Sequence, residues 1–111
     1  MTELETVVLG IIWLRGPLTA YAVRRELGAS PGAIYPLLHR LEEEGLIRAR
    51  VQSWGERGKT EYAVAPRGVE ALRRGKDEID AALAELDARR KWLTQIARGL
   101  NAGPRRKRAT A

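Results

Sequence analysis

Side chains capable of nucleophilic or acid–base chemistry are scarce in this chain of 111 residues. It has no cysteine, one histidine, His39, and serine only at Ser30 and Ser53. A hydrolytic or group-transfer enzyme needs a nucleophile, a base and a residue that orients the base, and these residues cannot supply such a set. The lack of cysteine also excludes a disulfide framework and a thiolate zinc site. We therefore expect a protein that is not an enzyme and that holds no metal or cofactor.

The remaining candidate chemistry is hydrogen bonding from one face of a predicted helix at residues 30–44. At about 100° per residue, four apolar side chains fall on one side and are expected in the core: Ile34, Leu37, Leu38 and Leu41. The opposite side carries Tyr35, His39 and Glu43, with Gly32, Pro36 and Arg40 beside them. Tyrosine, histidine and arginine can contact base edges and phosphates when such a helix enters the major groove of DNA. The acids at positions 42–44 favour an ordinary solvated face instead, and both interpretations stay open at this point.

The overall charge is a weak guide to DNA binding, although the formal net charge is +6. Residues 1–66 carry eight basic and eight acidic side chains, and residues 67–104 carry eight basic and six acidic ones. The four basic residues at 105–108 supply the rest of the excess. Runs of like charge at a chain end are usually solvated, so we predict a disordered tail rather than a DNA-binding arm.

A local excess of positive charge lies between residues 45 and 60. Arg48, Arg50, Arg57 and Lys59 are accompanied there by one acid, Glu56. We expect Arg57 and Lys59 to contact phosphate groups, which attract basic side chains irrespective of sequence. Arg48 and Arg50 are expected on a solvated sheet face.

Glycine and proline divide the first half of the chain into predicted helices. Apolar periodicity predicts helices at about residues 3–14, 20–27 and 30–44, with Thr19 and Ser30 as N-caps of the second and third. The first helix should bury one apolar face, made of Leu4, Val7, Val8, Ile11 and Ile12. Two short helices joined by a glycine-containing turn are typical of a helix-turn-helix.

Two strands are predicted next, at residues 47–52 and 60–65, because apolar and polar side chains alternate in both. A glycine-rich loop joins them, which predicts a β-hairpin directly after the helix-turn-helix. This order is that of a winged helix. The predicted fold class is therefore mainly α with a small β-hairpin.

The last predicted element is one long helix from about residue 66 to residue 100. A heptad register places five aliphatic residues in one position, Leu72, Ile79, Leu86, Leu93 and Leu100, with Leu83 beside them. Such a helix is roughly 50 Å long, which is more than a small domain can cover. We predict that a second copy of the chain covers it, so that Leu72, Ile79, Leu83, Leu86 and Leu93 form the interface of a homodimer.

The segment from Gly32 to Ile47, GAIYPLLHRLEEEGLI, resembles the recognition-helix pattern of PadR-family transcriptional regulators. That pattern has an aliphatic residue, Tyr-Pro, Leu, a basic position, Leu-Glu and Gly-Leu-Ile. Three further segments are similar to the family's second helix, wing and following helix: Leu18-Thr19-Ala20-Tyr21, Gly58-Lys59 with Tyr62-Ala63-Val64, and Pro66-Arg67-Gly68. The chain departs from the family at Ala20, Glu61 and Ala65, where glycine, an aromatic residue and threonine are usual.

This resemblance implies a winged helix-turn-helix domain at residues 1–66, a dimerisation helix at 67–101 and the basic tail at 102–111. It implies a homodimer that binds double-stranded DNA at a pseudo-palindromic operator, as a repressor relieved by a small molecule. The residues expected to contact DNA are Tyr21, Ser30, Gly32, Tyr35, Pro36, His39, Arg40, Arg57 and Lys59. A winged helix that binds only protein is the alternative interpretation.

The indole of Trp92 lies beside the leucine ladder and one turn from Ile96. Its large flat surface suits a planar aromatic effector, and Trp92, Ile96 and Trp13 are the candidate residues for such a site. Packing within the dimer alone explains the same residues and is the simpler interpretation.

No targeting or membrane segment is predicted. The chain opens with an acidic segment, whereas a signal peptide opens with a basic one. Its longest apolar stretch, residues 7–14, is far shorter than the roughly 20 residues that cross a bilayer. We expect a cytoplasmic protein without membrane contact.

Overall fold

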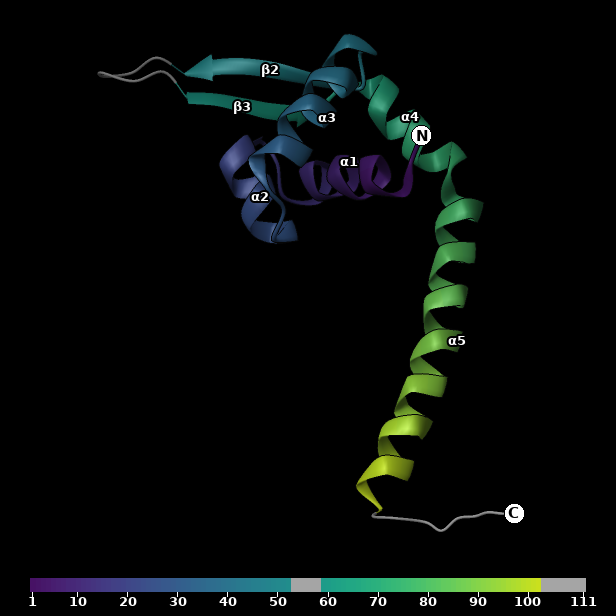
Figure 1. Cartoon of the computed structure of the whole chain (residues 1–111). Helices are drawn as coiled ribbons and strands as arrows, with labels where there is room; N and C mark the ends of the chain where they lie inside the picture. The colour runs from purple at the N-terminus through teal and green to yellow at the C-terminus, as the bar shows by residue number, and fades with distance from the viewer. Residues whose placement is uncertain (53–58, 103–111) are drawn as a thin grey trace. The chain divides into compact units, whose positions relative to one another are not determined.

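The computed structural model describes residues 1–52 and 59–102, and Figure 1 labels its five helices and the strands β2 and β3. The chain divides into two compact units, Met1–Gly75 and Lys76–Ala111. The first unit contains helices and a small sheet in this order: α1 (Glu3–Arg15), β1 (Leu18–Thr19), α2 (Ala20–Leu27), α3 (Pro31–Glu43), β2 (Ile47–Gln52), β3 (Lys59–Val64) and α4 (Pro66–Arg74). The second unit contains α5 (Lys76–Asn101). The predicted fold class, a mainly helical winged helix with a long C-terminal helix, is confirmed.

Local capping explains where the first helices begin and end. The Thr19 hydroxyl accepts a hydrogen bond from the Ala22 N–H at 3.1 Å and caps α2 as predicted. Gly28 ends α2 with φ of 64°, a conformation that favours glycine. Ser30 is the N-cap of α3, but its side chain makes no capping hydrogen bond, and Pro31 occupies the first turn.

Helix α3 continues through Pro36 despite the missing N–H of that residue. A proline in a helix interior costs about 3 kcal/mol. The buried face of α3 opposes this cost, because Ile34, Leu37, Leu38 and Leu41 are each at most 3% exposed. Full burial of one such side chain is worth about 1.5–3 kcal/mol, so the four together outweigh the proline.

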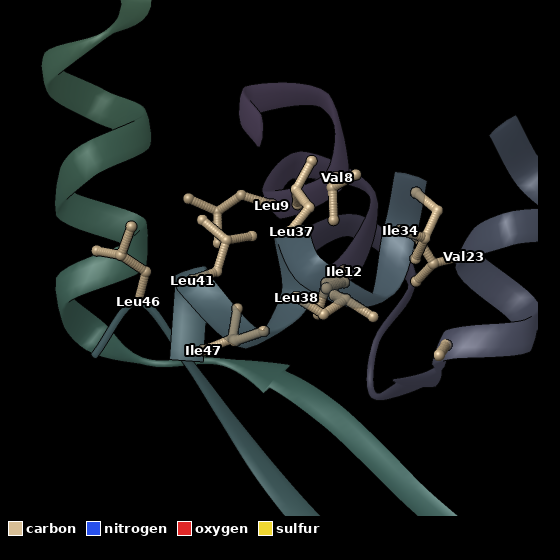
Figure 2. Packing of buried hydrophobic residues seen from close by; sticks show 11 residues of the cluster. Val8, Leu9, Ile12, Val23, Ile34, Leu37, Leu38, Leu41, Leu46 and Ile47 are labelled. Atoms are coloured by element: carbon tan, nitrogen blue, oxygen red, sulfur yellow. The ribbon is translucent and has the colours of Figure 1, made fainter. Parts of the chain in front are cut away.

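The hydrophobic core lies between α1, α2, α3 and the start of β2, as Figure 2 shows. Prediction of the α3 face was correct, but prediction of the α1 face was wrong in part. Helix α1 buries Val8, Leu9 and Ile12, whereas Leu4 and Val7 are 42% and 38% exposed. Helix α1 carries its own apolar residues on most of its sides, so periodicity alone could not indicate which face is buried.

The sheet has three antiparallel strands in the order β1-β3-β2. Strands β2 and β3 pair from Ile47–Val64 to Gln52–Lys59 and form the predicted hairpin. Strand β1 was not predicted, because two residues show no alternation. Its pairing of Leu18 with Tyr62 and Thr19 with Glu61 brings the start of α2 beside β3.

The long C-terminal helix predicted from residue 66 to residue 100 is in fact two helices. Helix α4 ends at Arg74, and the Gly75 N–H bonds to the carbonyls of Ala71 and Arg73. Ala71 and Leu72 pack against the core, so the first unit extends to Gly75 and not only to residue 66. In the ranges 1–52 and 59–102 no helix is long and apolar enough to cross a membrane.

We predict that Gly68→Ala destabilises the first unit. A Cβ at Gly68 would overlap the Leu46 carbonyl oxygen and would lie 2.7 Å from the Val64 Cγ1 atom. Overpacking of this kind costs about 1–3 kcal/mol, which urea unfolding would measure. Gly10→Ala is the control, because a Cβ there meets nothing within 4 Å and alanine favours the helix by about 1 kcal/mol. Equal stability of the two variants would contradict the close approach of α4 to Leu46.

Candidate nucleic-acid interface

The outer face of α3 collects most of the predicted DNA-contacting residues. The apolar side chains of its inner face are buried, so the side chains that lie between these apolar residues in the sequence must point outward. Ser30, Gly32, Tyr35, Pro36 and His39 are all exposed, and Tyr35 retains 52% of its surface. The structure therefore exposes five of the predicted DNA-contacting residues together at the start and on the first half of α3.

A cavity of about 530 Å³ lies beside this face, between α2, α3 and β3. Residues from β1, from the start of α2, from α3 and from β3 line it: Thr19, Ala20, Tyr21, Tyr35, Lys59, Thr60 and Tyr62. All three tyrosines of the chain are in this set. We call it the tyrosine pocket. It brings together three predicted site residues, Tyr21, Tyr35 and Lys59, which are far apart in sequence.

Six of the seven residues that line the tyrosine pocket have a hydroxyl or an ammonium that can donate a hydrogen bond, and none of the seven is a carboxylate. Tyr62 is the most buried of the three phenols. Burial raises its pKa, and the charge of Glu42 and the neighbouring Tyr35 raise it further. The Tyr62 hydroxyl is therefore protonated throughout the neutral range and can donate a hydrogen bond into the pocket.

Arg25 lies over the ring of Tyr21, one of the residues that line the tyrosine pocket. The guanidinium carbon of Arg25 lies 6.0 Å from the centroid of the Tyr21 ring, within the range of a cation–π interaction. Neighbouring Arg24 instead donates to the Ala29 carbonyl at 3.4 Å, across the turn before α3. Of this pair, Arg25 is thus the one whose guanidinium lies against a residue that lines the pocket.

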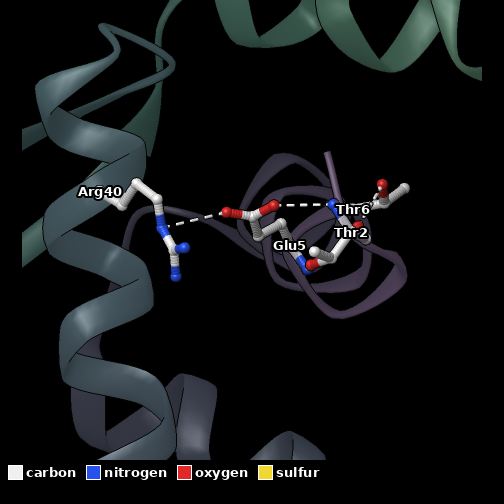
Figure 3. A network of polar contacts seen from close by, with 4 residues as sticks. All are labelled: Thr2, Glu5, Thr6 and Arg40. Atoms are coloured by element: carbon white, nitrogen blue, oxygen red, sulfur yellow. Dashed lines mark hydrogen bonds and ion pairs between the residues drawn. The ribbon is translucent and has the colours of Figure 1, made fainter.

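Arg40 does not lie with the other predicted contacts but pairs with α1, as Figure 3 shows. Its Nε lies 3.2 Å from Oε2 of Glu5, a carboxylate whose side chain is only 9% exposed. The other oxygen of Glu5 accepts the Thr2 N–H at 2.7 Å, and the Glu5 N–H donates to the Thr2 hydroxyl at 3.1 Å. The Thr-x-x-Glu spacing is the sequence signal for this capping box, although we did not predict it. No spacing in the sequence indicates the ion pair with Arg40.

The capping box and Arg40 together lower the pKa of Glu5. The Thr2 backbone N–H has the largest effect, and the Thr2 hydroxyl, the Arg40 charge and the N-terminal amine act in the same direction against burial. Glu5 is therefore ionised at neutral pH and ties α1 to the middle of α3. His39 makes a looser contact, 3.5 Å from its Nε2 to Oε2 of Glu43, with both side chains exposed.

Several predicted residues fall elsewhere. Arg57 and the basic residues at 105–108 lie outside the described residues. Leu72 belongs to α4 and packs in part on the core of the first unit. Within α5 no side chain is buried, and the predicted interface and effector residues are partly or largely exposed: Ile79, Leu83, Leu86, Trp92, Leu93 and Ile96. Trp13, at the end of α1, is 54% exposed.

Residues 8–74 match the family model of the PadR-like transcriptional regulators. The chain belongs to this family. The match covers all the elements that build the exposed α3 face and the tyrosine pocket, and it confirms the family that the Tyr-Pro segment indicated. A family of transcriptional regulators has a non-enzymatic role, as the scarcity of catalytic residues predicted.

Individual relatives agree with this assignment. The transcriptional regulator Rv3488 of Mycobacterium tuberculosis is 36% identical over 70 residues, which are 60% of this chain and 62% of that protein. The chain thus spans less than two thirds of that relative.

Solved structures of PadR regulators share the fold. The PadR-like regulator of Bacillus cereus superposes with a TM-score of 0.65 at 25% identity, over 77% of this chain and 88% of that one. A PadR family regulator of Clostridium difficile superposes with a TM-score of 0.67 at 15% identity, over 78% and 97% of the two chains.

We predict that Glu5 contributes stability that acid removes. Because its pKa is lower in the folded chain than its ordinary value of 4.5, its contribution is present above that value and is lost as the pH falls through the folded pKa. Glu5→Gln should lower the free energy of unfolding by about 1–2 kcal/mol at pH 7 and by less at pH 3. Urea unfolding at both pH values measures this difference.

Glu70→Gln is the matched control for this prediction. Glu70 is an exposed acid of α4 and has no ion-pair partner among the described residues. Its substitution should change stability little at either pH. A Glu5→Gln variant that loses the same free energy at pH 7 and pH 3 would show that the Glu5 carboxylate charge is not the source of the effect.

Proposed function

We propose that this PadR-like chain is a homodimeric, sequence-specific DNA-binding regulator that inserts α3 into the major groove. The observation that carries the proposal is the division of α3 into two faces. Its buried face fixes the helix on α1 and α2, and its outer face presents Tyr35 and His39 at the surface. Helix-turn-helix proteins dock the second helix of the motif in this way.

The sheet supports the same docking. Strands β2 and β3 pair as far as Gln52 and Lys59, so the hairpin extends beyond the core. The exposed ammonium of Lys59 stands at the end of this hairpin and lines the pocket beside Tyr35. A hairpin in this position acts as a wing, whose basic side chains add affinity for phosphates without reading sequence.

Dimerisation is proposed from the surface of α5. Four leucines of this helix, at spacings of three and seven residues, are 49–76% exposed: Leu83, Leu86, Leu93 and Leu100. An apolar stripe of this length on a soluble helix requires a partner. A second copy supplies an identical stripe, and the two α3 helices would then read half-sites roughly 34–36 Å apart on a pseudo-palindromic operator.

The finer regulatory proposal is a repressor released by a planar aromatic molecule. Trp92 and Ile96 are 66% and 55% exposed on α5, one helical turn apart. An indole at a dimer seam can stack a flat ligand through dispersion. Such a ligand would release DNA by favouring a spacing of the two protomers that does not match the operator.

We predict that His39→Ala reduces the preference for operator DNA. Loss of one base contact costs about 1–3 kcal/mol, so the affinity for a duplex selected from a random pool should fall about tenfold or more. The affinity for a scrambled duplex should change little. Fluorescence anisotropy of labelled duplexes measures both.

Arg89→Ala is the control for this variant, because it removes an exposed charge from α5 and leaves α3 intact. It should leave the ratio of the two affinities unchanged. Wild-type protein that binds both duplexes equally, or neither, would overturn the DNA-reading role and favour a winged helix that binds protein.

We predict that Leu93→Glu converts the dimer to a monomer. The substitution places a charge in the proposed apolar seam, whereas the side chain is 65% exposed within one protomer, so the fold should remain. Sedimentation equilibrium at micromolar concentration measures the change in mass. Lys91→Glu, at an exposed position of α5 outside the leucine stripe, should leave the protein a dimer. A monomeric wild-type protein would contradict the proposal.

A further inference from the structure

We propose that Glu5 is a positioning residue for DNA reading: its ion pair with Arg40 selects the face of α1 that meets the core and thereby fixes α3. The inference rests on the proposed DNA-binding function. It gives Arg40 a role inside the protein, in place of the DNA contact that the sequence suggested. Both residues act through the placement of α3 and not by touching DNA.

Glu5 is the one charged side chain that is buried in the ranges 1–52 and 59–102. Burial of an ionised carboxylate is unfavourable unless partners compensate for it. Two partners meet its two oxygens, as Figure 3 shows: Oε1 accepts the Thr2 N–H at 2.7 Å, and Oε2 lies 3.2 Å from Nε of Arg40. Thr2 caps the same helix, so Arg40 is the partner that joins Glu5 to another element.

Helix α1 has two faces that could meet the core. One face has four apolar residues at helical spacing: Leu4, Val7, Ile11 and Leu14. The other face combines three apolar residues with one acid: Glu5, Val8, Leu9 and Ile12. The fold buries the face that contains the acid, whereas Leu4, Val7 and Leu14 are 42%, 38% and 75% exposed. Hydrophobic burial is non-directional, so it does not by itself select the face with a carboxylate and fewer apolar residues.

The partners of Glu5 supply the attraction that favours this face. The pKa of Glu5 is lowered in the fold, first by the Thr2 backbone N–H, and Arg40 acts in the same direction against burial. The ionised carboxylate is therefore more favourable in the fold than in water. A rotation of α1 that buried Leu4 and Val7 would be roughly a third of a turn and would carry Glu5 away from Arg40. Selection of one arrangement among several is the best-attested role of a buried ion pair, which adds little net stability.

Arg40 lies where α3 needs an anchor. Pro36 removes one backbone hydrogen bond from the interior of the helix, so the second half of α3 is joined less tightly to the first. Arg40 follows Pro36 by about one turn and is adjacent to His39, which points outward. An ion pair that holds Arg40 on α1 therefore also holds the direction in which His39 is presented to DNA.

The test removes the charges of the pair one at a time and together. Glu5→Gln keeps an oxygen that can accept the Thr2 N–H, and Arg40→Gln neutralises the other partner. Each should lower the ratio of operator affinity to scrambled-duplex affinity about tenfold in fluorescence anisotropy. The double variant should be no worse than either single variant, because both remove the same interaction. The slope of log affinity against log salt should stay that of the wild type.

Further variants separate positioning from stability. Partial unfolding lowers both affinities equally, so the ratio of the two affinities reports on the folded protein alone. Glu5→Met combined with Arg40→Met replaces the pair by apolar residues, which should keep or raise the urea midpoint and should still lower the ratio. Glu26→Gln is the matched control. It breaks an exposed ion pair between α1 and α2, Arg15 Nη1 to Glu26 Oε1 at 2.6 Å, and should leave the ratio unchanged.

Methyl NMR reads the buried face of α1 without DNA. In the wild type, the methyl groups of Leu9 should show NOEs to the core leucines of α3, and those of Leu4 should show none. In the double methionine variant, Leu4 should gain NOEs to these leucines, because the ion pair no longer selects between the two faces.

Three outcomes would count against the proposal in different ways. If Arg40→Gln lowers the salt slope by about 0.9 and its effect adds to that of Glu5→Gln, Arg40 contacts a phosphate and is not a positioning residue. A wild-type affinity ratio in the double methionine variant, without NOEs from Leu4, would show that apolar packing alone selects the face and would overturn the proposal. Wild-type protein without operator preference would remove the DNA-reading function and the positioning role with it, and the NOEs would then show only which face the ion pair selects.

Discussion

The buried stripe of α3 is the constraint on which the rest of the first unit depends. Ile34, Leu37, Leu38 and Leu41 are almost completely buried against α1 and α2, and they fix both the position and the rotation of the helix. Rotation of α3 by half a turn would expose all four and cost several kilocalories per mole. The outer face is therefore specified by the inner one. This also explains how α3 retains Pro36, since burial of the stripe offsets the lost backbone hydrogen bond.

The order of the sheet converts that fixed helix into a site. Strand β3 is central, and β1 pairs with it immediately before α2 begins. This pairing carries Thr19 and Tyr21 to the same place as Lys59 and Tyr62, beside Tyr35 of α3. The two-residue strand β1 thus has a larger effect on the site than its length suggests. It joins the start of α2 directly to the hairpin, in addition to the packing of α2 on α3.

The positions of helices and strands were predicted from the sequence better than the tertiary contacts between them. Helices α2 and α3, the hairpin and the buried face of α3 follow from periodicity and turn residues, which are local signals. The choice of buried face on α1 failed, because apolar residues lie on most sides of that helix and only packing selects among them. The interruption at Gly75 was also missed, since a leucine at position 72 fits a heptad while its side chain packs on the core.

The candidate site shows the same division between local and long-range information. Tyr21, Tyr35 and Lys59 were predicted singly, but Tyr62 was noted only as part of the predicted second strand and of the segment similar to the family's wing. Its place in the pocket depends on the β1–β3 pairing. Arg40 was assigned to DNA from its place near the outer face of α3. Its partner, Glu5, is 35 positions away in the chain, and no local pattern indicates that α1 presents a carboxylate there.

Ion pairing explains how a segment with no net charge can present a basic surface. Residues 1–66 contain equal numbers of acidic and basic side chains. Arg15, Arg40 and Arg50 pair with Glu26, Glu5 and Glu61, so these arginines and acids largely cancel within the fold. No described carboxylate pairs with Lys59, which lines the tyrosine pocket, or with Arg25, which lies over the Tyr21 ring, although the charge of Glu42 acts on Tyr62 in the same pocket. The field that a phosphate meets is set by such uncompensated charges within about 10 Å, the screening length in salt, and not by the sum over the chain. Position, and not net charge, therefore determines where this fold can hold DNA.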